Sequence, residues 1–135
     1  SKKHAVFPKV VITDTAKTQY IFRINKGKEL LSQSINKHMS EKKRPIPFDN
    51  MIYIGDGLTD VPSMALLKKE GGHSIAVYQK KLKEQVRISK NLLNVNRVDF
   101  IAPADYRINS ELHEKTCLLL DYVIAKIRYD IKLKI

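Results

Sequence analysis

The carboxyl-terminal two thirds of the chain alternates short apolar runs with longer segments in which apolar residues recur at helical spacing. The apolar runs at 51–54, 73–78 and 98–102 predict strands, and the segments after Asp60, over 81–93 and from Ser110 predict helices. A strand–helix order that repeats three times predicts an α/β fold, with a Rossmann-like parallel sheet, flanking helices and right-handed crossovers.

The first part of the chain has a different pattern. Two apolar runs, PKVVIT and QYIFRI, flank the polar segment DTAKT, which favours a β-hairpin over about 8–25. Asn25 is then expected to cap a helix with Leu30, Leu31 and Ile35 on one face. The chain is therefore predicted to be a single domain over 1–135, with the hairpin at about 8–25 and the α/β core at about 26–135.

The net charge of +11 would suit nucleic acid, an anionic membrane or an anionic small molecule. The basic residues are spread along the chain, and the aromatic residues lie in apolar runs without alternating with them. This pattern does not favour a nucleic-acid surface, for which stacking aromatics would be expected. No apolar run is long enough to span a bilayer, so no membrane association is predicted.

Cys117 is the single cysteine, so no disulfide within the chain is possible. With no visible signal peptide, this favours a reducing, cytoplasmic location. Cys117 precedes three leucines and is expected to be a buried apolar residue. His73 stands just before a predicted strand and is expected to be structural.

The stretch from Met51 to Asp60, MIYIGDGLTD, concentrates the candidate chemistry. Gly55 and Gly57 allow a tight turn around Asp56, and Thr59 and Asp60 suit the start of a helix. Two carboxylates then lie at the carboxyl end of a strand, where open α/β sheets bind ligands.

Carboxylates in this position suit Mg²⁺, which prefers oxygen ligands and retains several waters. A simple turn with Asp60 as a helix cap is the alternative interpretation. A dinucleotide fingerprint would need a third glycine in place of Asp60, and a calcium loop would need other residues at Gly57 and Thr59.

IYIGDGLTDVPSM resembles the fourth sequence motif of haloacid dehalogenase-type phosphatases. The resemblance implies that Asp56 is a direct Mg²⁺ ligand and Asp60 a second one acting through water, with Gly55, Gly57 and Thr59 forming the supporting loop. INKGKEL resembles the third motif, which implies that Lys26 stabilises the nucleophile and the transferring phosphoryl group. The implied substrate is a phosphorylated small molecule.

The chain departs from this family at the first motif, whose leading aspartate is the nucleophile. The nearest imitation is VVITDTAKT, in which Ala16 replaces the second aspartate, and Asp14 is read as a hairpin-turn residue. We therefore expect the carboxyl-terminal portion of a phosphatase, inactive or weak alone. The alternative is a non-catalytic module or partner subunit that binds Mg²⁺ or phosphate. The expected partners are the missing amino-terminal segment or a second copy of the chain, because the sheet would have an open edge.

Overall fold

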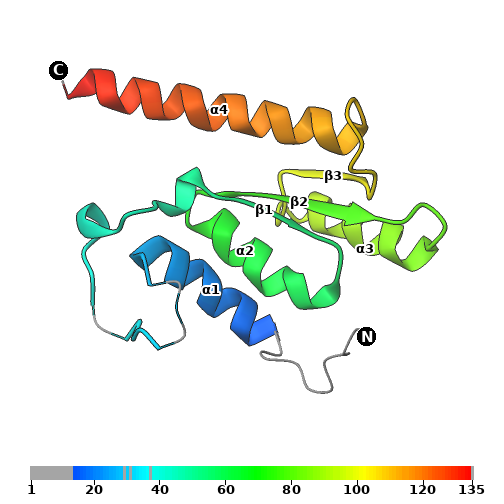
Figure 1. The fold of residues 1–135 in the computed structure, drawn as a ribbon. Coiled ribbons are helices and arrows are strands. Elements are labelled where there is room, and N and C mark those ends of the chain that lie inside the picture. Colours follow the sequence, from blue (N-terminus) through cyan, green and yellow to red (C-terminus); the bar gives the residue numbers. More distant parts are fainter. Residues whose placement is uncertain (1–13, 29, 31, 37, 135) are drawn as a thin grey trace, which may run out of the picture.

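A computed structural model describes residues 14–28, 30, 32–36 and 38–134 of the chain. Four helices and three strands alternate along it (Figure 1): α1 (Asp14–Lys26), β1 (Ile52–Gly55), α2 (Val61–Lys69), β2 (His73–Tyr78), α3 (Lys83–Asn94), β3 (Phe100–Pro103) and α4 (Glu111–Leu133). Short 3-10 turns occur at Glu41–Lys43, Phe48–Asn50 and Leu58–Asp60.

The three strands form one parallel sheet in the order β1-β2-β3. Gly55 pairs with Ala76 at the end of β1, and Tyr78 pairs with Pro103 at the end of β3. In Figure 1, α4 covers one face of the sheet and α1, α2 and α3 lie on the other. The predicted α/β fold with a parallel sheet and flanking helices is confirmed, and the arrangement is consistent with a Rossmann-like layout.

Side chains that alternate along β2 divide the core into two layers. Ile75 and Val77 pack with Leu112 and Leu119 of α4, whereas Ala76 faces the opposite way. On that opposite face, the buried residues are Met64, Ala76, Leu92 and Val98. The continuous apolar run of β2 follows from its central place, because both of its faces are covered.

The predicted β-hairpin is wrong over the residues that the structure describes. Residues 14–26 form α1, which contains the whole of the expected second strand, while residues 8–13 lie outside the described part. A short apolar run fits a strand and a buried helix equally well. The helix is favoured because Ile21 and Asn25, four residues apart, are both buried on one face. Asp14 therefore begins a helix, where a hairpin turn was expected.

The helix expected after Asn25 is also absent from the described residues. Helix α1 ends at Lys26, and Gly27 follows with a φ of +68°, a left-handed conformation that suits glycine at a helix end. The buried Arg23 then donates through Nη1 to the carbonyl oxygens of Lys28, Leu30 and Gln33. These bonds satisfy carbonyl groups of the loop, so the segment folds without a helix of its own.

Helix α4 begins as predicted, because Ser110 caps it by accepting a hydrogen bond from the His113 amide at 3.1 Å. Cys117 is exposed, so the expectation that it is buried is wrong. It lies beside the stripe that packs on the sheet, which Leu112, Leu119 and Val123 supply. Among the described helices, none has the length and apolar character needed to cross a membrane.

Candidate functional site

The turn after β1 is organised by the Asp60 side chain. Asp60 ends the 3-10 turn and precedes α2, and its carboxylate is directed back toward the end of the strand. Its Oδ2 accepts hydrogen bonds from the backbone amides of Asp56 and Gly57, each at 3.1 Å. One carboxylate oxygen therefore holds the backbone of the GDG turn.

Gly55 is required by the approach of Asp60 to the strand. A Cβ placed on Gly55 would lie 2.7 Å from Asp60 Cγ, which is closer than real Cβ contacts allow. A Cβ on Gly57 would meet nothing closer than 3.7 Å. Gly55 is thus the glycine that packing demands in this turn.

The other oxygen of Asp60 accepts from two side chains of different elements. Lys17 Nζ, from the beginning of α1, lies 2.7 Å from Oδ1, and the Tyr53 hydroxyl lies 2.7 Å from the same atom. Lys17 Nζ also donates to Thr59 Oγ1 at 3.0 Å. Asp60 therefore accepts four hydrogen bonds, about as many as a carboxylate has sites for.

The environment of Asp60 keeps it ionised. Burial raises its pKa, but hydrogen bonds from Lys17, Tyr53 and the Gly57 amide bring the pKa below its ordinary value. The Tyr53 hydroxyl shows the complementary effect, since burial and its bond to the Asp60 carboxylate raise its pKa. The site thus contains a fixed carboxylate–ammonium pair at neutral pH.

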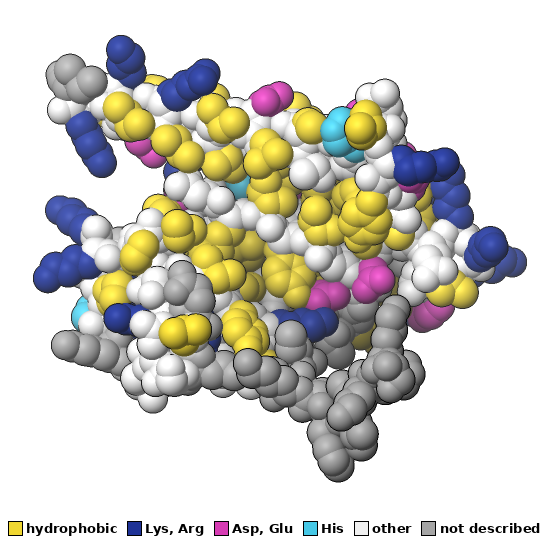
Figure 2. All heavy atoms as spheres, viewed as in Figure 1, with side chains coloured by type: hydrophobic (Ala, Val, Ile, Leu, Met, Phe, Trp, Pro, Cys, Tyr) yellow, Lys and Arg dark blue, Asp and Glu magenta, His cyan; other side chains and the backbone are white. Residues whose placement is uncertain are grey.

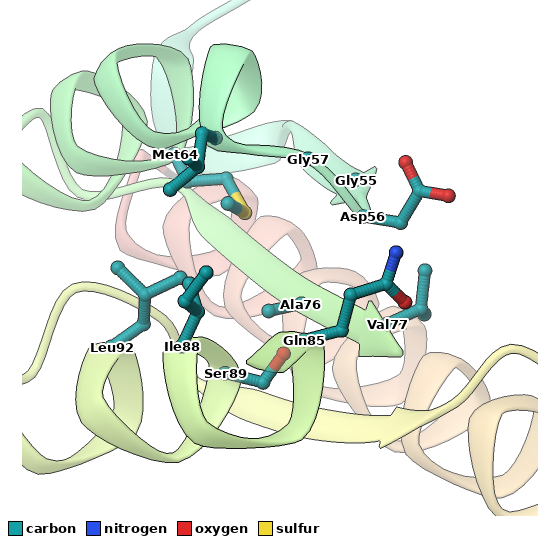
Figure 3. A pocket seen from close by; sticks show the side chains of 11 residues that line it. Gly55, Asp56, Gly57, Met64, Ala76, Val77, Gln85, Ile88, Ser89 and Leu92 are labelled. Carbon is teal, nitrogen blue, oxygen red and sulfur yellow. The ribbon is translucent and has the colours of Figure 1, made fainter. Parts of the chain in front are cut away.

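Asp56 is the exposed carboxylate of the two. Figure 3 shows it at the rim of the neighbouring cavity, with its carboxylate directed away from the apolar side chains that line the cavity. Because the Asp60 oxygens are engaged by four donors, Asp56 is the one able to bind a cation directly. Among the described residues, no three His, Cys, Asp or Glu side chains converge as a metal centre. A Mg²⁺ ion here would fit as a one-carboxylate site completed by water, a mode that Mg²⁺ commonly uses.

The structure brings Lys17, and not Lys26, to the Asp60 carboxylate. Lys26 is the last residue of α1, nine residues or about 13 Å along the helix from Lys17. Its Nζ donates to the Ile35 carbonyl oxygen at 2.7 Å. The sequence could have pointed to Lys17 as a lysine near the beginning of a helix, but the hairpin interpretation assigned this segment to a turn.

A cavity of about 210 Å³ lies next to Asp56, between α2 and α3 (Figure 3). Its walls are mainly apolar and include Met64, Ile88 and Leu92. Gln85 is the amide in its lining, and its Oε1 accepts from the Gln79 amide at 2.9 Å. The apolar lining does not suit a phosphate group, so the candidate site is the open edge that Asp56 faces.

His73 is the first residue of β2, so it lies at the amino-terminal ends of the strands, opposite the carboxyl ends where Asp56 lies. Its ring packs edge-on against Tyr122 of α4, with ring centroids 5.4 Å apart, and its Nδ1 lies 3.6 Å from Asp99 Oδ1. These packing contacts, at the end of the sheet away from Asp56, fit the expected structural role of His73.

Comparison with known proteins gives one informative relationship. No protein-family model and no solved structure matches the chain. A protein of Borreliella burgdorferi (strain ATCC 35210 / DSM 4680 / CIP 102532 / B31), described as an uncharacterized protein, is 37% identical over 114 residues. The match includes 79% of this chain and spans 38% of the length of that relative.

Proposed function

We propose that this chain carries the metal-binding part of a Mg²⁺-dependent phosphatase site of the haloacid dehalogenase type, acting on a phosphorylated small molecule. One observation carries the proposal. At the carboxyl ends of the parallel strands, an exposed Asp56 lies next to an Asp60 whose two oxygens are already occupied by Lys17 and other donors. This end of the sheet is where open α/β sheets bind ligands.

The proposed roles follow from the contacts of each side chain. Asp56 would hold Mg²⁺ directly, and Asp60, whose oxygens are already occupied, positions the Asp56 amide. Water would complete the coordination of the metal. When bound, Mg²⁺ supplies charge stabilisation to the transferring phosphoryl group. Gly55, Gly57 and Thr59 form the loop that supports the two carboxylates.

Lys17 is the better candidate for the cationic role that the sequence resemblance gave to Lys26. Its ammonium already lies 2.7 Å from Asp60 and beside Thr59, so it adds positive charge at the site. In phosphoryl transfer, such a charge stabilises the transition state and the attacking carboxylate. The position of Lys26 at the other end of α1 is difficult to reconcile with that role.

The nucleophilic aspartate is proposed to come from another segment, either the amino-terminal part of a longer protein or a partner chain. It would attack phosphorus, form an aspartyl phosphate and release the alcohol, and water would then cleave the acyl phosphate. The alternative is a non-catalytic Mg²⁺- or phosphate-binding module, which the exposed Asp56 carboxylate would serve equally well.

The first test is metal binding, followed by amide NMR with Mn²⁺ as a paramagnetic substitute for Mg²⁺. We expect selective broadening of amides 55–60, reversed by excess Mg²⁺ and lost in Asp56→Asn. The matched control is Asp105→Asn, a carboxylate at the end of another strand. Broadening that is unchanged by Asp56→Asn would contradict the proposed metal site.

The second test is hydrolysis of an aryl phosphate with Mg²⁺, comparing the chain with its Asp56→Asn variant. We expect negligible turnover from both and Mg²⁺-dependent turnover after a segment containing the first motif is added. Turnover that Asp56→Asn does not reduce would contradict the assignment. Mg²⁺ binding without any restored turnover would support the binding-module alternative.

A further inference from the structure

A second cavity opens at the same sheet edge, between the loops that follow β2 and β3. Its lining includes Tyr78 and Pro103, which pair at the ends of these strands, and Lys80, Lys81 and Tyr106 of the loops that follow. Its volume is about 670 Å³, within the range of small-molecule sites. We call it the β2–β3 pocket.

The charge of the β2–β3 pocket favours an anionic ligand. Its lining contains two acids, and each has its own cation: Asp105 is bound through both oxygens by Arg107, and Glu111 by Lys115 at 2.8 Å. Hydrogen bonds from Arg107 lower the pKa of Asp105 to about 2, so Asp105 is ionised at neutral pH and its charge is offset by Arg107. Lys80 and Lys81 then supply the excess positive charge.

The loop after β3 is held in place around this pocket. The Ala104 amide donates to the Tyr78 carbonyl at 2.8 Å, and Ser110 Oγ donates to the Asp105 carbonyl at 2.7 Å. These bonds tie the loop to β2 and to the beginning of α4. The wall that carries Tyr106 is therefore a fixed part of the fold.

Tyr106 gives the pocket an aromatic surface. Tyr106 is 71% exposed although it lies on this fixed loop, and Tyr78 is a second tyrosine in the lining of the pocket. An aromatic ring that contributes little to the core is available to stack on a planar ligand, and lysines nearby suit its phosphate.

We propose that the β2–β3 pocket binds the ring-bearing part of an aromatic phosphate ester, of which a nucleotide is the simplest biological form. Neighbouring strands lie about 4.8 Å apart, so the pocket is roughly one to two strand spacings from the end of β1. A substrate of nucleotide size with its ring in the pocket can reach Asp56 with its phosphate once Mg²⁺ is bound there. Without the metal, its phosphate stays with Lys80 and Lys81. As a statement about substrate, the inference rests on the proposed function.

The test is a titration of the complete chain with adenosine 5′-monophosphate in Mg²⁺-free buffer, followed by amide NMR. We expect shifts at residues 78–81 and 104–107, and weaker binding of ribose 5-phosphate, which lacks the aromatic ring. Equal affinity for the two esters, or shifts confined to other residues, would overturn the inference.

Variants of the pocket provide the second arm. We expect Tyr106→Ala to weaken binding of the nucleotide at least about five-fold, as loss of one stacking contact predicts. Lys80→Gln combined with Lys81→Gln should weaken both esters by about ten-fold. Matched controls are Tyr129→Ala and Lys132→Gln, two exposed residues of the same types on α4. Equal losses in the controls would show that the pocket is not the site.

The metal site at Asp56 and the nucleotide site in the β2–β3 pocket can be tested independently of each other. Loss of Mn²⁺ broadening at residues 55–60 tests the Asp56 site without any nucleotide, and the nucleotide titration contains no metal. Nucleotide binding that persists in Asp56→Asn, together with normal metal binding in Tyr106→Ala, is the expected pattern. Metal binding without nucleotide binding would overturn this inference and leave the proposed function standing.

Discussion

At the scale of single residues, Asp60 connects three parts of the chain through its two oxygens. Lys17 belongs to α1, Tyr53 to β1, and the Asp56 and Gly57 amides to the turn between β1 and α2. The carboxylate is therefore a structural centre as well as a candidate participant in binding. Its substitution should affect folding, whereas that of Asp56 should affect function alone.

We expect Asp60→Asn to lower the free energy of unfolding by about 2–3 kcal/mol, because it leaves Lys17 without its charged partner and replaces an acceptor oxygen by an amide. Urea denaturation provides the measurement. The control is Asp56→Asn, an exposed carboxylate, for which a change within about 0.5 kcal/mol is expected. Equal effects of the two substitutions would contradict the structural role of Asp60.

The Gly55 and Gly57 positions give a matched pair of substitutions. Gly55→Ala would place a Cβ 2.7 Å from Asp60 Cγ, whereas Gly57→Ala would meet only ordinary contacts. We expect the first to destabilise the fold by about 1–3 kcal/mol, as overpacking does, and the second to have little effect. Thermal denaturation would measure both effects. A larger loss of stability from Gly57→Ala than from Gly55→Ala would contradict the requirement for glycine at position 55.

The lowered pKa of Asp60 predicts a dependence of stability on pH. The folded state favours the charged carboxylate, so its contribution is complete above about pH 5 and is lost as pH falls through the ordinary value of 3.8 toward the folded pKa. Unfolding measured from pH 7 to 3 should show this loss. The slope should be smaller in Asp60→Asn, and Asp105→Asn, measured in parallel, accounts for the second lowered carboxyl.

At the scale of elements, the sequence predicted the strands and helices from Ile52 onward because pattern and turn chemistry agree there. Gly71, with a φ of +91°, ends α2 where the pattern places a turn, and Ser110 caps α4. Before Met51 the signals conflict. The apolar run of α1 is too short to set its own period, and two polar residues of α1, Arg23 and Asn25, are buried on different sides of the helix. Buried polar residues of this kind cannot be recognised from the sequence until the groups that they bind in the fold are known.

The candidate site likewise has a part that the sequence could predict and a part that it could not. Asp56 and Asp60 could be predicted because five consecutive residues bring them together, as a turn with local chemistry. Lys17 could not be placed, because it is 43 residues away from Asp60 in the sequence and reaches it only through the packing of α1 against α2. Contacts over that separation are set by the tertiary fold.

Arg23 provides a prediction at this scale, since its Nη1 donates to three carbonyls of the loop after α1. We expect Arg23→Gln to lower stability by about 1–3 kcal/mol, because three carbonyls of the loop lose the donor that the buried Arg23 supplies. Hydrogen exchange over 27–36 should accelerate more than exchange in β2. The control is Arg87→Gln, which removes an exposed pair with Glu84. Uniform acceleration would contradict a local role for Arg23.

At the scale of the whole molecule, β1 is an edge strand of the described sheet, and its Ile54 is 38% exposed. Figure 2 shows hydrophobic side chains gathered between α4 and the helices on the other side of the sheet. Exposed apolar residues of α4 include Leu120, Ile124 and Ile131. An open strand edge beside apolar surface favours pairing with another segment.

We therefore expect the isolated chain to self-associate in a concentration-dependent way, measured by light scattering. Ile54→Lys should reduce association, because a charge on an edge strand opposes pairing. Leu133→Lys, at the far end of α4, is the control and should change it less. A monodisperse monomer at all concentrations would contradict this prediction.

The charge balance at the end of β1 also determines the order in which a metal ion and a phosphate group can bind there. Two carboxylates and one ammonium leave the end of β1 with one net negative charge. A phosphate dianion that approached before any cation would be repelled, whereas a divalent ion at Asp56 would reverse the local sign. Under the proposed function, metal must therefore precede the phosphate group at Asp56. Lys17 offsets only one of the two carboxylates, so it weakens this repulsion without removing it.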